Sequence, residues 1–349
     1  MDKKLKNYAY YRLPEQSHYT FVAQTEGSPL VLDSVVKLNG CAGFAMAPFV
    51  VSEQHPVLLL QPDVIESHEV ETPATMEGSS TVVTERATEK TAYASDFRKF
   101  HAETQAGRFG KIVLSRCCQI ESPEAINAKD LFLKACDLYP HQFIALVSMQ
   151  QAGTWLMATP EVLLNSSDDE WHTMALAGTM KRENDAQDVS KAVWTEKNRE
   201  EQHYVSTYIM SVLSQFADTV SAHGPYTTEA AHLLHLRTDF TFRLHNASHI
   251  GTLIEALYPT PAVCGIPKED ARAFITANES IERKYYSGFC GPLALQGSTH
   301  LYVALRCMEI IGNKLRLYAG GGILHDSNMT SEWQETQTKM QTMLRLLTI

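Results

Sequence analysis

Two β-prone runs late in the 349-residue sequence constrain its fold more than any other feature. Residues 301–311 and 314–319 flank Gly312 and Asn313, a two-residue connection that is typical of a β-hairpin. A run of three glycines at 320–322 follows the second strand directly. Hairpin strands of this length require an antiparallel sheet, and the rest of the sequence lacks the regular strand–helix alternation of a doubly wound fold. The sequence therefore predicts an α+β fold, in which large antiparallel β-sheets pack against helices.

The remaining elements are predicted from hydrophobic spacing and capping residues. We expect strands at 111–120, 143–149, 154–158, 162–164 and 171–177. We expect helices at 95–107, 123–138, 188–216, 247–257, 268–283 and 332–347. Ser95 and Ser331 are the predicted caps of two of these helices, and Val193 is expected to face the core. The chain divides into a β-rich part at 1–93, with a polar connection near 62–93, and a larger catalytic region at 94–349.

Composition excludes several classes of protein. Hydrophobic residues make up 44% of the chain, so a large core can form, and the net charge of −10 argues against binding to nucleic acid or to anionic membranes. No apolar run approaches the ~18 residues of a membrane span, and the basic first residues precede no apolar signal core. We therefore expect a soluble, cytoplasmic protein. The seven cysteines include no Cys-x-x-Cys pair, so neither a disulfide framework nor a zinc site is predicted.

Ten short strings, in order over about 250 residues, resemble the chorismate-utilising enzymes. This family contains the isochorismate, salicylate, anthranilate and aminodeoxychorismate synthases. Its members share the α+β fold predicted above, and the isochorismate synthases are the branch that this sequence resembles most. The strings lie at residues 111–116, 158–161, 176–179, 196–201, 235–238, 259–265, 286–288, 305–306, 319–323 and 332–336. Each is weak by itself, but ten in order are highly specific.

The resemblance implies an acid and a base on either side of a substrate ring. Lys111 is the implied general base for a water molecule, and it begins an apolar strand in which desolvation is expected. Glu161 is the implied general acid, which requires an apolar setting that keeps its carboxyl protonated. Without the resemblance, the alternative interpretation is that Lys111 is a lysine facing solvent and that Glu161 is a glutamate in a loop.

The resemblance also implies a magnesium ion held by Glu201 and Glu335. Mg²⁺ prefers oxygen ligands and is typically bound by one or two carboxylates, with water and substrate completing its coordination. The alternative reading is a solvated helix face for Glu201 and an ordinary i,i+4 pair for Glu335 with Lys339. One departure from the family pattern stands beside this site. The family usually has His directly after the first glutamate, whereas this chain has Gln202, and His203 comes one residue later, about 100° around a helix.

Chorismate is a dicarboxylate, so its site must be locally positive in a chain that is acidic overall. Arg306 and Lys339 are the candidate cations, and Tyr286 is a neutral donor. The glycine run would let backbone N–H groups approach the substrate, although a β-turn or a bulge explains it equally well. The full set of substrate-binding residues implied by the resemblance is Arg306, Lys339, Tyr286, Gly320, Gly321, Gly322, His235, Thr238, Ala262, Val263, Gly178 and Thr179.

Two positions discriminate among the reactions of the family. Ala177 stands where one aminodeoxychorismate branch carries a nucleophilic lysine, and Lys111 stands where anthranilate synthases have a non-basic residue. The sequence therefore indicates isochorismate synthase, with Mg²⁺ as cofactor and menaquinone biosynthesis as the expected pathway. Siderophore biosynthesis, a salicylate or anthranilate synthase, and a non-catalytic chorismate- or nucleotide-binding protein stay open as alternatives. No glutamine amidotransferase subunit is expected, and the oligomeric state is left open, a monomer included.

Overall fold

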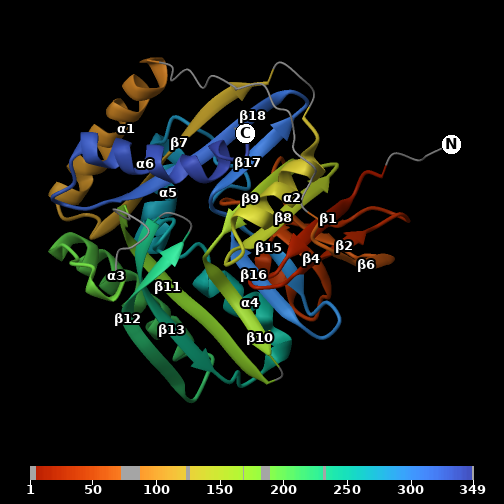
Figure 1. Cartoon of the computed structure of the whole chain (residues 1–349). Coiled ribbons are helices and arrows are strands. Elements are labelled where there is room, and N and C mark those ends of the chain that lie inside the picture. The colour runs from red at the N-terminus through yellow and green to blue at the C-terminus, as the bar shows by residue number, and fades with distance from the viewer. Residues whose placement is uncertain are drawn as a thin grey trace.

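Two nine-stranded antiparallel sheets form the centre of the computed structural model, which describes residues 5–71, 87–122, 126–167, 169–181, 189–230 and 233–347 (Figure 1). The first sheet has the order β14 (Gly265–Ile266), β7 (Lys111–Glu121), β18 (Lys314–Ile323), β17 (Cys307–Ile311), β9 (Gly153–Thr159), β8 (Phe143–Met149), β1 (Tyr8–Arg12), β2 (His18–Ala23) and β6 (Val64–Glu69). The second has the order β12 (Val220–Ala230), β13 (Leu233–Phe242), β11 (Glu170–Lys181), β10 (Val162–Ser167), β16 (Thr299–Val303), β15 (Phe289–Leu293), β4 (Gly43–Ala47), β5 (Val57–Leu60) and β3 (Leu30–Leu32).

The two sheets pack face to face, and helices cover their outer sides. One apolar cluster joins the sheets, with Phe143 of β8 stacked on Tyr302 of β16 at 4.2 Å between ring centroids. The α-helices are α1 (Ala87–Gln105), α2 (Ala128–Leu138), α3 (Glu196–Leu213), α4 (Ile250–Leu257), α5 (Lys268–Asn278) and α6 (Met329–Leu344). The α2 and α6 helices pack on the first sheet, and α3 and α4 pack on the second. The predicted α+β class is confirmed.

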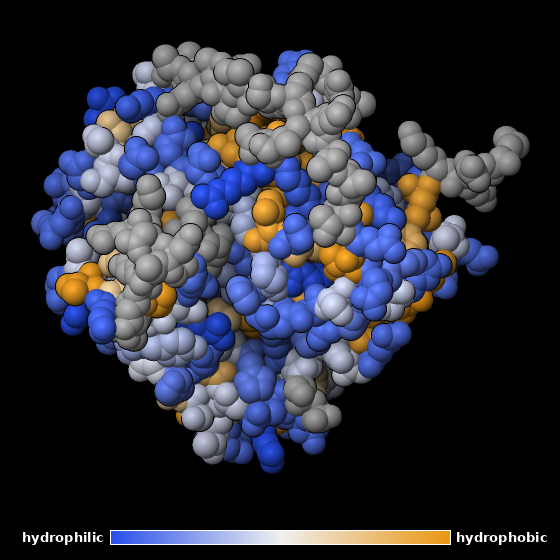
Figure 2. Space-filling model, in the orientation of Figure 1, coloured by the Kyte–Doolittle hydropathy of each residue, from blue (hydrophilic) through white to orange (hydrophobic). Residues whose placement is uncertain are grey.

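A further feature of the molecule is the hydropathy of its surface. The face in Figure 2 is mostly hydrophilic, with apolar residues scattered among the charged ones. Within the described residues, no helix is long and apolar enough to cross a membrane.

The predicted hairpin is present, but one predicted strand is wrong. Gly312 and Asn313 connect β17 to β18, and Gly312 has a φ of +62°, which favours glycine. The run 301–311 is not one strand, because the chain leaves the second sheet after Val303 and enters the first at Cys307. Arg306 makes this crossing with a φ of +45°, a left-handed conformation that non-glycine residues rarely adopt.

Other differences lie at element ends. The long helix begins at Glu196, because the Thr195 side chain accepts a hydrogen bond from the backbone N–H of Asn198. Val193 therefore precedes the helix and is 83% exposed, so its predicted place in the core is wrong. Ser95 lies inside α1 rather than at its start, and Asn328, not Ser331, caps α6. Strands β12 and β13, which pair with each other, were not predicted from the sequence.

The proposed boundary near residue 93 stays a prediction. The strands before it are shared between the sheets, since β1, β2 and β6 extend the first and β3, β4 and β5 extend the second. Within the polar connection expected at 62–93, residues 64–69 form strand β6, and residues 72–86 lie outside the described part of the chain.

A buried ion pair joins β7 to the segment that follows α5 and to the segment that precedes β14. Arg283 and Glu279 are each about 2% exposed in their side chains and lie 2.6 Å apart. Arg283 also donates to the carbonyls of Val113 and Val263, and Glu279 accepts from the N–H of Ser115. Each charge is thus paired and hydrogen-bonded, which offsets the cost of removing it from water.

Replacing Arg283 by Met would leave the Glu279 carboxyl buried without its partner. We expect the free energy of unfolding to fall by about 3–5 kcal/mol in urea denaturation. The exposed pair of Lys37 and Asp33, at 2.8 Å, provides the matched control, and Lys37→Met should change stability little. Equal losses in the two variants would contradict a structural role for the buried pair.

Candidate functional site

A cavity opens between the sheets at the point where the chain crosses from one to the other. Its walls come from β7 and β18 of the first sheet, β11 and β13 of the second, and helices α3 and α6. The residues that line it are Val113, Pro160, Glu161, Leu176, Ala177, Gly178, Thr179, Glu201, His235, Ala262, Val263, Tyr286, Leu305, Arg306, Tyr318, Ala319, Gly320, Gly321, Gly322 and Lys339.

Arg306 is the buried cation of this cavity. Only 7% of it is exposed, and burial lowers the pKa of its guanidinium to about 10. Its Nη2 donates to Nε2 of His235 at 3.1 Å, while Nη1 has no hydrogen-bond partner among the described residues. A buried donor without a partner is costly, so Nη1 is available for an acceptor such as a ligand carboxylate.

His235 holds Arg306 in place as a neutral ring. Its Nδ1 lies 2.9 Å from the carbonyl oxygen of Gly178, which can only accept, so Nδ1 carries the proton and Nε2 accepts from Arg306. Burial and the Arg306 charge together hold the pKa of His235 well below its usual value. The imidazole therefore stays neutral and positions the guanidinium.

Close packing explains why glycines form one wall. A Cβ atom at Gly322 would lie 2.5 Å from Oε1 of Glu201 and 2.7 Å from Cε of Lys111. A Cβ atom at Gly320 would lie 2.8 Å from the Ser115 hydroxyl oxygen. Contacts this short leave no room for a side chain, so Gly320 and Gly322 are required by packing as well as by access to the cavity.

Lys111 lies beside Gly322, on the same side of this glycine as Glu201. The side chain is wholly buried, and its Nζ forms an ion pair with Oε1 of Glu201 at 2.8 Å. The other carboxylate oxygen of Glu201 accepts a hydrogen bond from the N–H of Gly178 at 3.2 Å. Burial alone would raise the pKa of Glu201, but the Lys111 charge and hydrogen bond outweigh it and lower the pKa. Glu201 is therefore a carboxylate at neutral pH.

Glu161 lies in the same cavity, but the pKa of its carboxyl is shifted in the opposite direction, upward. It is 2% exposed, and its side chain accepts one long hydrogen bond, of 3.4 Å, from the Thr260 hydroxyl. Burial raises the pKa of Glu161 to about 7, although the nearby Lys111 charge acts in the other direction. A carboxyl in this state can give up a proton close to neutral pH.

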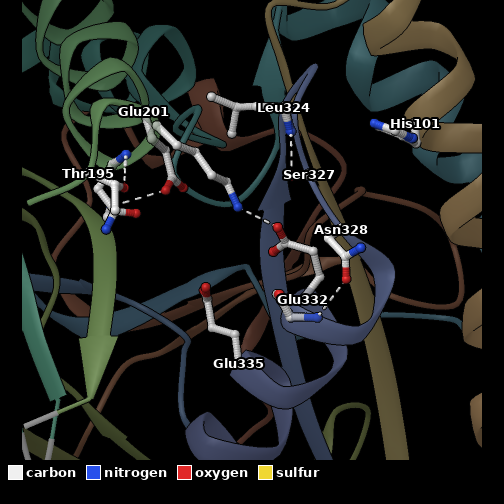
Figure 3. A network of polar contacts seen from close by, with 12 residues as sticks. His101, Thr195, Glu201, Leu324, Ser327, Asn328, Glu332 and Glu335 are labelled. Carbon is white, nitrogen blue, oxygen red and sulfur yellow. Dashed lines mark hydrogen bonds and ion pairs between the residues drawn. The ribbon is translucent and has the colours of Figure 1, made fainter.

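Helix α6 carries a cation that lines the cavity and two carboxyl groups that are outside its lining set. Lys339 donates to the carbonyl of Gly320 at 2.9 Å and forms an ion pair with Glu335 at 2.7 Å. Glu332, one turn before Glu335, is in contact with Lys197 from the first turn of α3. Figure 3 shows Glu332 and Glu335 facing the space between α3 and α6, as Glu201 does from the other side.

Glu201, Glu332 and Glu335 are the candidate ligands for a metal ion. Among the described residues, no three His, Cys, Asp or Glu side chains form a ready-made metal cluster. Glu201 borders Gly322, whereas Glu332 and Glu335 border the adjacent Gly321, where a Cβ atom would lie 3.3 Å from Glu332 Oε2 and 3.6 Å from Glu335 Oε1. That oxygen of Glu332 is buried and, within the described chain, accepts no hydrogen bond. Carboxylate oxygens in this number suit Mg²⁺, which keeps several waters.

Most of the predicted site residues line the cavity, and three do not. Lys111 and Glu335 are outside the lining set, although each contacts a lining residue, Glu201 and Lys339 respectively. Thr238 is directed away from the cavity, because its hydroxyl accepts a hydrogen bond from Nε2 of Gln202 at 3.1 Å. The remaining predicted residues are all in the lining set given above.

Sequence reasoning missed two residues that a periodic pattern could have found. Tyr318 precedes Gly320 by two positions on β18, so it shares a face with that glycine, and its ring stacks on Tyr286 at 5.4 Å. Glu332 precedes Glu335 by three positions on α6, which places both on one side of the helix. As expected, His203 faces away from the site and is exposed, whereas Gln202 is buried.

Comparison with known proteins gives one consistent result. Residues 48–348 match the model of a family described as chorismate binding enzyme. Isochorismate synthase EntC of Escherichia coli K12 is 29% identical over 263 residues, covering 74% of this chain and 67% of that protein. Isochorismate synthase DhbC of Bacillus subtilis 168 is 33% identical over 253 residues, covering 69% of this chain and 64% of that protein. The chain thus matches about two thirds of the length of these relatives.

A solved structure shows the same fold. MenF, the menaquinone-specific isochorismate synthase of Escherichia coli, superposes with a TM-score of 0.83 at 23% identity, over 99% of this chain and 90% of that one. The resemblance stated from the sequence, and the fold that it implied, are confirmed.

The packing of the glycine wall can be tested by stability. Gly322→Ala would place a methyl group 2.5 Å from Glu201, and we expect the resulting overpacking to cost about 1–3 kcal/mol. Gly321→Ala is the matched control, since its nearest neighbour would be 3.3 Å away, and it should be milder. Thermal unfolding of both variants measures the difference, and an unchanged Tm for Gly322→Ala would refute the close contact.

Proposed function

Because the chain belongs to the chorismate binding enzyme family, we propose that it is an isochorismate synthase, an isomerase that converts chorismate into isochorismate. One observation carries this proposal. The cavity holds a buried carboxyl, Glu161, whose pKa is about 7, and a wholly buried amine, Lys111, lies close enough to influence it. An acid and a base near one cavity suit the exchange of one hydroxyl for another on a ring.

The cavity also suits a substrate with two carboxylates. Arg306 and Lys339 give it positive charge although the chain carries a net charge of −10. Arg306 offers the unpartnered Nη1, and its fork geometry matches a carboxylate. Tyr286 adds a neutral hydroxyl donor at the same wall.

We propose that Glu201 and Glu335 hold a magnesium ion. Bound there, Mg²⁺ would supply positive charge beside the ring carboxylate of chorismate. Glu332 borders the same space and is a further candidate oxygen donor.

The acid–base roles then follow from the environments of two residues. In its neutral amine form, Lys111 takes a proton from water as the water oxygen bonds to ring carbon 2. The ring double bonds shift, the bond from carbon 4 to its hydroxyl breaks, and Glu161 gives the departing hydroxyl a proton, so that water leaves. One water is taken up and one released, and a proton returned from Lys111 to Glu161 resets the site.

Specific side chains disfavour the other reactions of the family. Ala177 lines the cavity, so no lysine is available there for covalent attack on the ring. Lys111 suits water, which must be deprotonated, better than ammonia. Salicylate synthase remains the second candidate, because a further loss of pyruvate would use the same residues.

We propose menaquinone biosynthesis as the pathway and the cytoplasm as the location, with no amidotransferase subunit. Siderophore biosynthesis is the alternative fate of the product. Growth complementation of bacteria that lack isochorismate synthase would separate the two pathways, because one phenotype is respiratory and the other depends on iron.

Product analysis tests the proposed reaction directly. We expect the purified protein, given chorismate and Mg²⁺, to form isochorismate without pyruvate, as followed by chromatography. Addition of excess chelator should abolish turnover. Salicylate with pyruvate would favour the second candidate, and no product under any condition would favour a binding protein.

The base can be tested apart from its charge. Lys111→Ala should lower kcat by ~10²–10⁴-fold, the usual loss for a positioned general base. Lys111→Arg keeps a positive charge beside Glu201 but cannot deprotonate water near neutral pH. A similar loss in both variants would support proton transfer, whereas substantial activity in Lys111→Arg would mean that charge alone is needed.

The raised pKa of Glu161 predicts how the rate depends on pH. The carboxyl donates only while protonated, so its contribution is present below about pH 7 and is lost as pH rises above that value. We expect kcat to fall about tenfold per pH unit on the alkaline side. Glu161→Gln should be nearly inactive at every pH, and a rate that increases steadily from pH 6 to 9 would contradict Glu161 as the acid.

A further inference from the structure

Gln202 is a buried amide beside a candidate metal ligand. It is 1% exposed and follows Glu201 on α3. Successive residues on a helix point about 100° apart, so Glu201 faces the cavity while Gln202 faces the sheet behind it.

The amide bridges two neighbouring strands of that sheet. Its Nε2 donates to the carbonyl of Ala175 on β11 and to the hydroxyl of Thr238 on β13, both at 3.1 Å. Ala175 and Thr238 are directly opposite each other in the β11–β13 pairing. One side chain therefore fixes α3 to a single point in the register of two strands.

A second attachment lies three residues further along β11. The N–H of Gly178 donates to Glu201 Oε2, and a Cβ atom at Gly178 would lie 3.1 Å from the carbonyl oxygen of Asn198 on α3. Apolar residues of α3 such as Val205 and Ile209 also pack against the described part of this sheet, but without directional preference. Only the polar contacts can set where along β11 the helix rests.

The amide does not serve stability alone. Its Oε1 is buried and has no hydrogen-bond partner in the part of the chain that the structure describes. An apolar side chain of similar volume would fill the same space without an unsatisfied acceptor. A directional role is the property that such a replacement would lose.

We infer that Gln202 is a positioning residue that fixes α3 on the β11–β13 strands so that the Glu201 carboxylate is held at the metal site. This inference deepens the proposed function and rests on it for the identity of the metal. Outer contacts of this kind typically change metal affinity by 10–100-fold when they are removed.

The test measures Mg²⁺ binding to the metal-free protein by calorimetry, without any turnover. Gln202→Met keeps the length of the side chain and removes both donors, and we expect Mg²⁺ binding to weaken by about 10–100-fold. Gln202→His retains one ring N–H donor and should lie between Met and the wild type. In assays with chorismate, saturating Mg²⁺ should restore most of kcat in both variants.

A matched control separates positioning from stability. Thr173 is also buried on β11, but it donates to the carbonyl of Leu163 on β10 at 2.8 Å rather than to α3. Thr173→Val should lower Tm without changing Mg²⁺ affinity. The inference is overturned if Gln202→Met and Gln202→His bind Mg²⁺ within twofold of the wild type. If the wild type binds Mg²⁺ but forms no isochorismate, the proposed function fails while the positioning result still stands.

Discussion

The buried ion pair between Lys111 and Glu201 is the contact on which the candidate site depends. Its members come from β7 of the first sheet and from α3, which packs on the second, and a Cβ atom at Gly322 would overlap both side chains. Burying either charge without the other would be strongly unfavourable. The pair can therefore form only when β7, Gly322 of β18 and the first turns of α3 are all in place. The site is therefore complete only when both sheets are folded.

The chain and its proposed substrate are both negatively charged, so binding requires positive charge within the site. A protein with a net charge of −10 repels a dicarboxylate at long range, so attraction must be local. Lys111, Lys339 and Arg306 supply the positive charge, and carboxyl groups partly neutralise the two lysines. Arg306 differs, because its side-chain neighbour His235 is held neutral by burial. Its charge is thus the least compensated of the three.

The sequence predicted most of the site because short strings carry local chemistry, but it could not predict how the strings meet. The hairpin followed from turn residues, and most of the predicted site residues lie around one cavity. The crossing at Arg306 was missed, because 301–311 has the composition of a single strand and the change of sheet depends on contacts with residues distant in sequence. The β12–β13 pair was missed for the same reason. The position of Thr238 depended on Gln202, whose partners are set only by tertiary packing.

Two glutamates in one cavity show how environment assigns different roles to one residue type. Burial acts on both Glu161 and Glu201 and favours the neutral form of each. Glu201 has an ammonium group at 2.8 Å and a backbone N–H at 3.2 Å, and these reverse the effect of burial. Glu161 has a single hydroxyl at 3.4 Å among its described neighbours, which is too weak to do so. Near neutral pH, Glu201 is therefore a carboxylate suited to a cation, while Glu161 retains a proton that it can donate. Exchanging the two roles would require moving Lys111, because the difference between the carboxyls lies in what surrounds them.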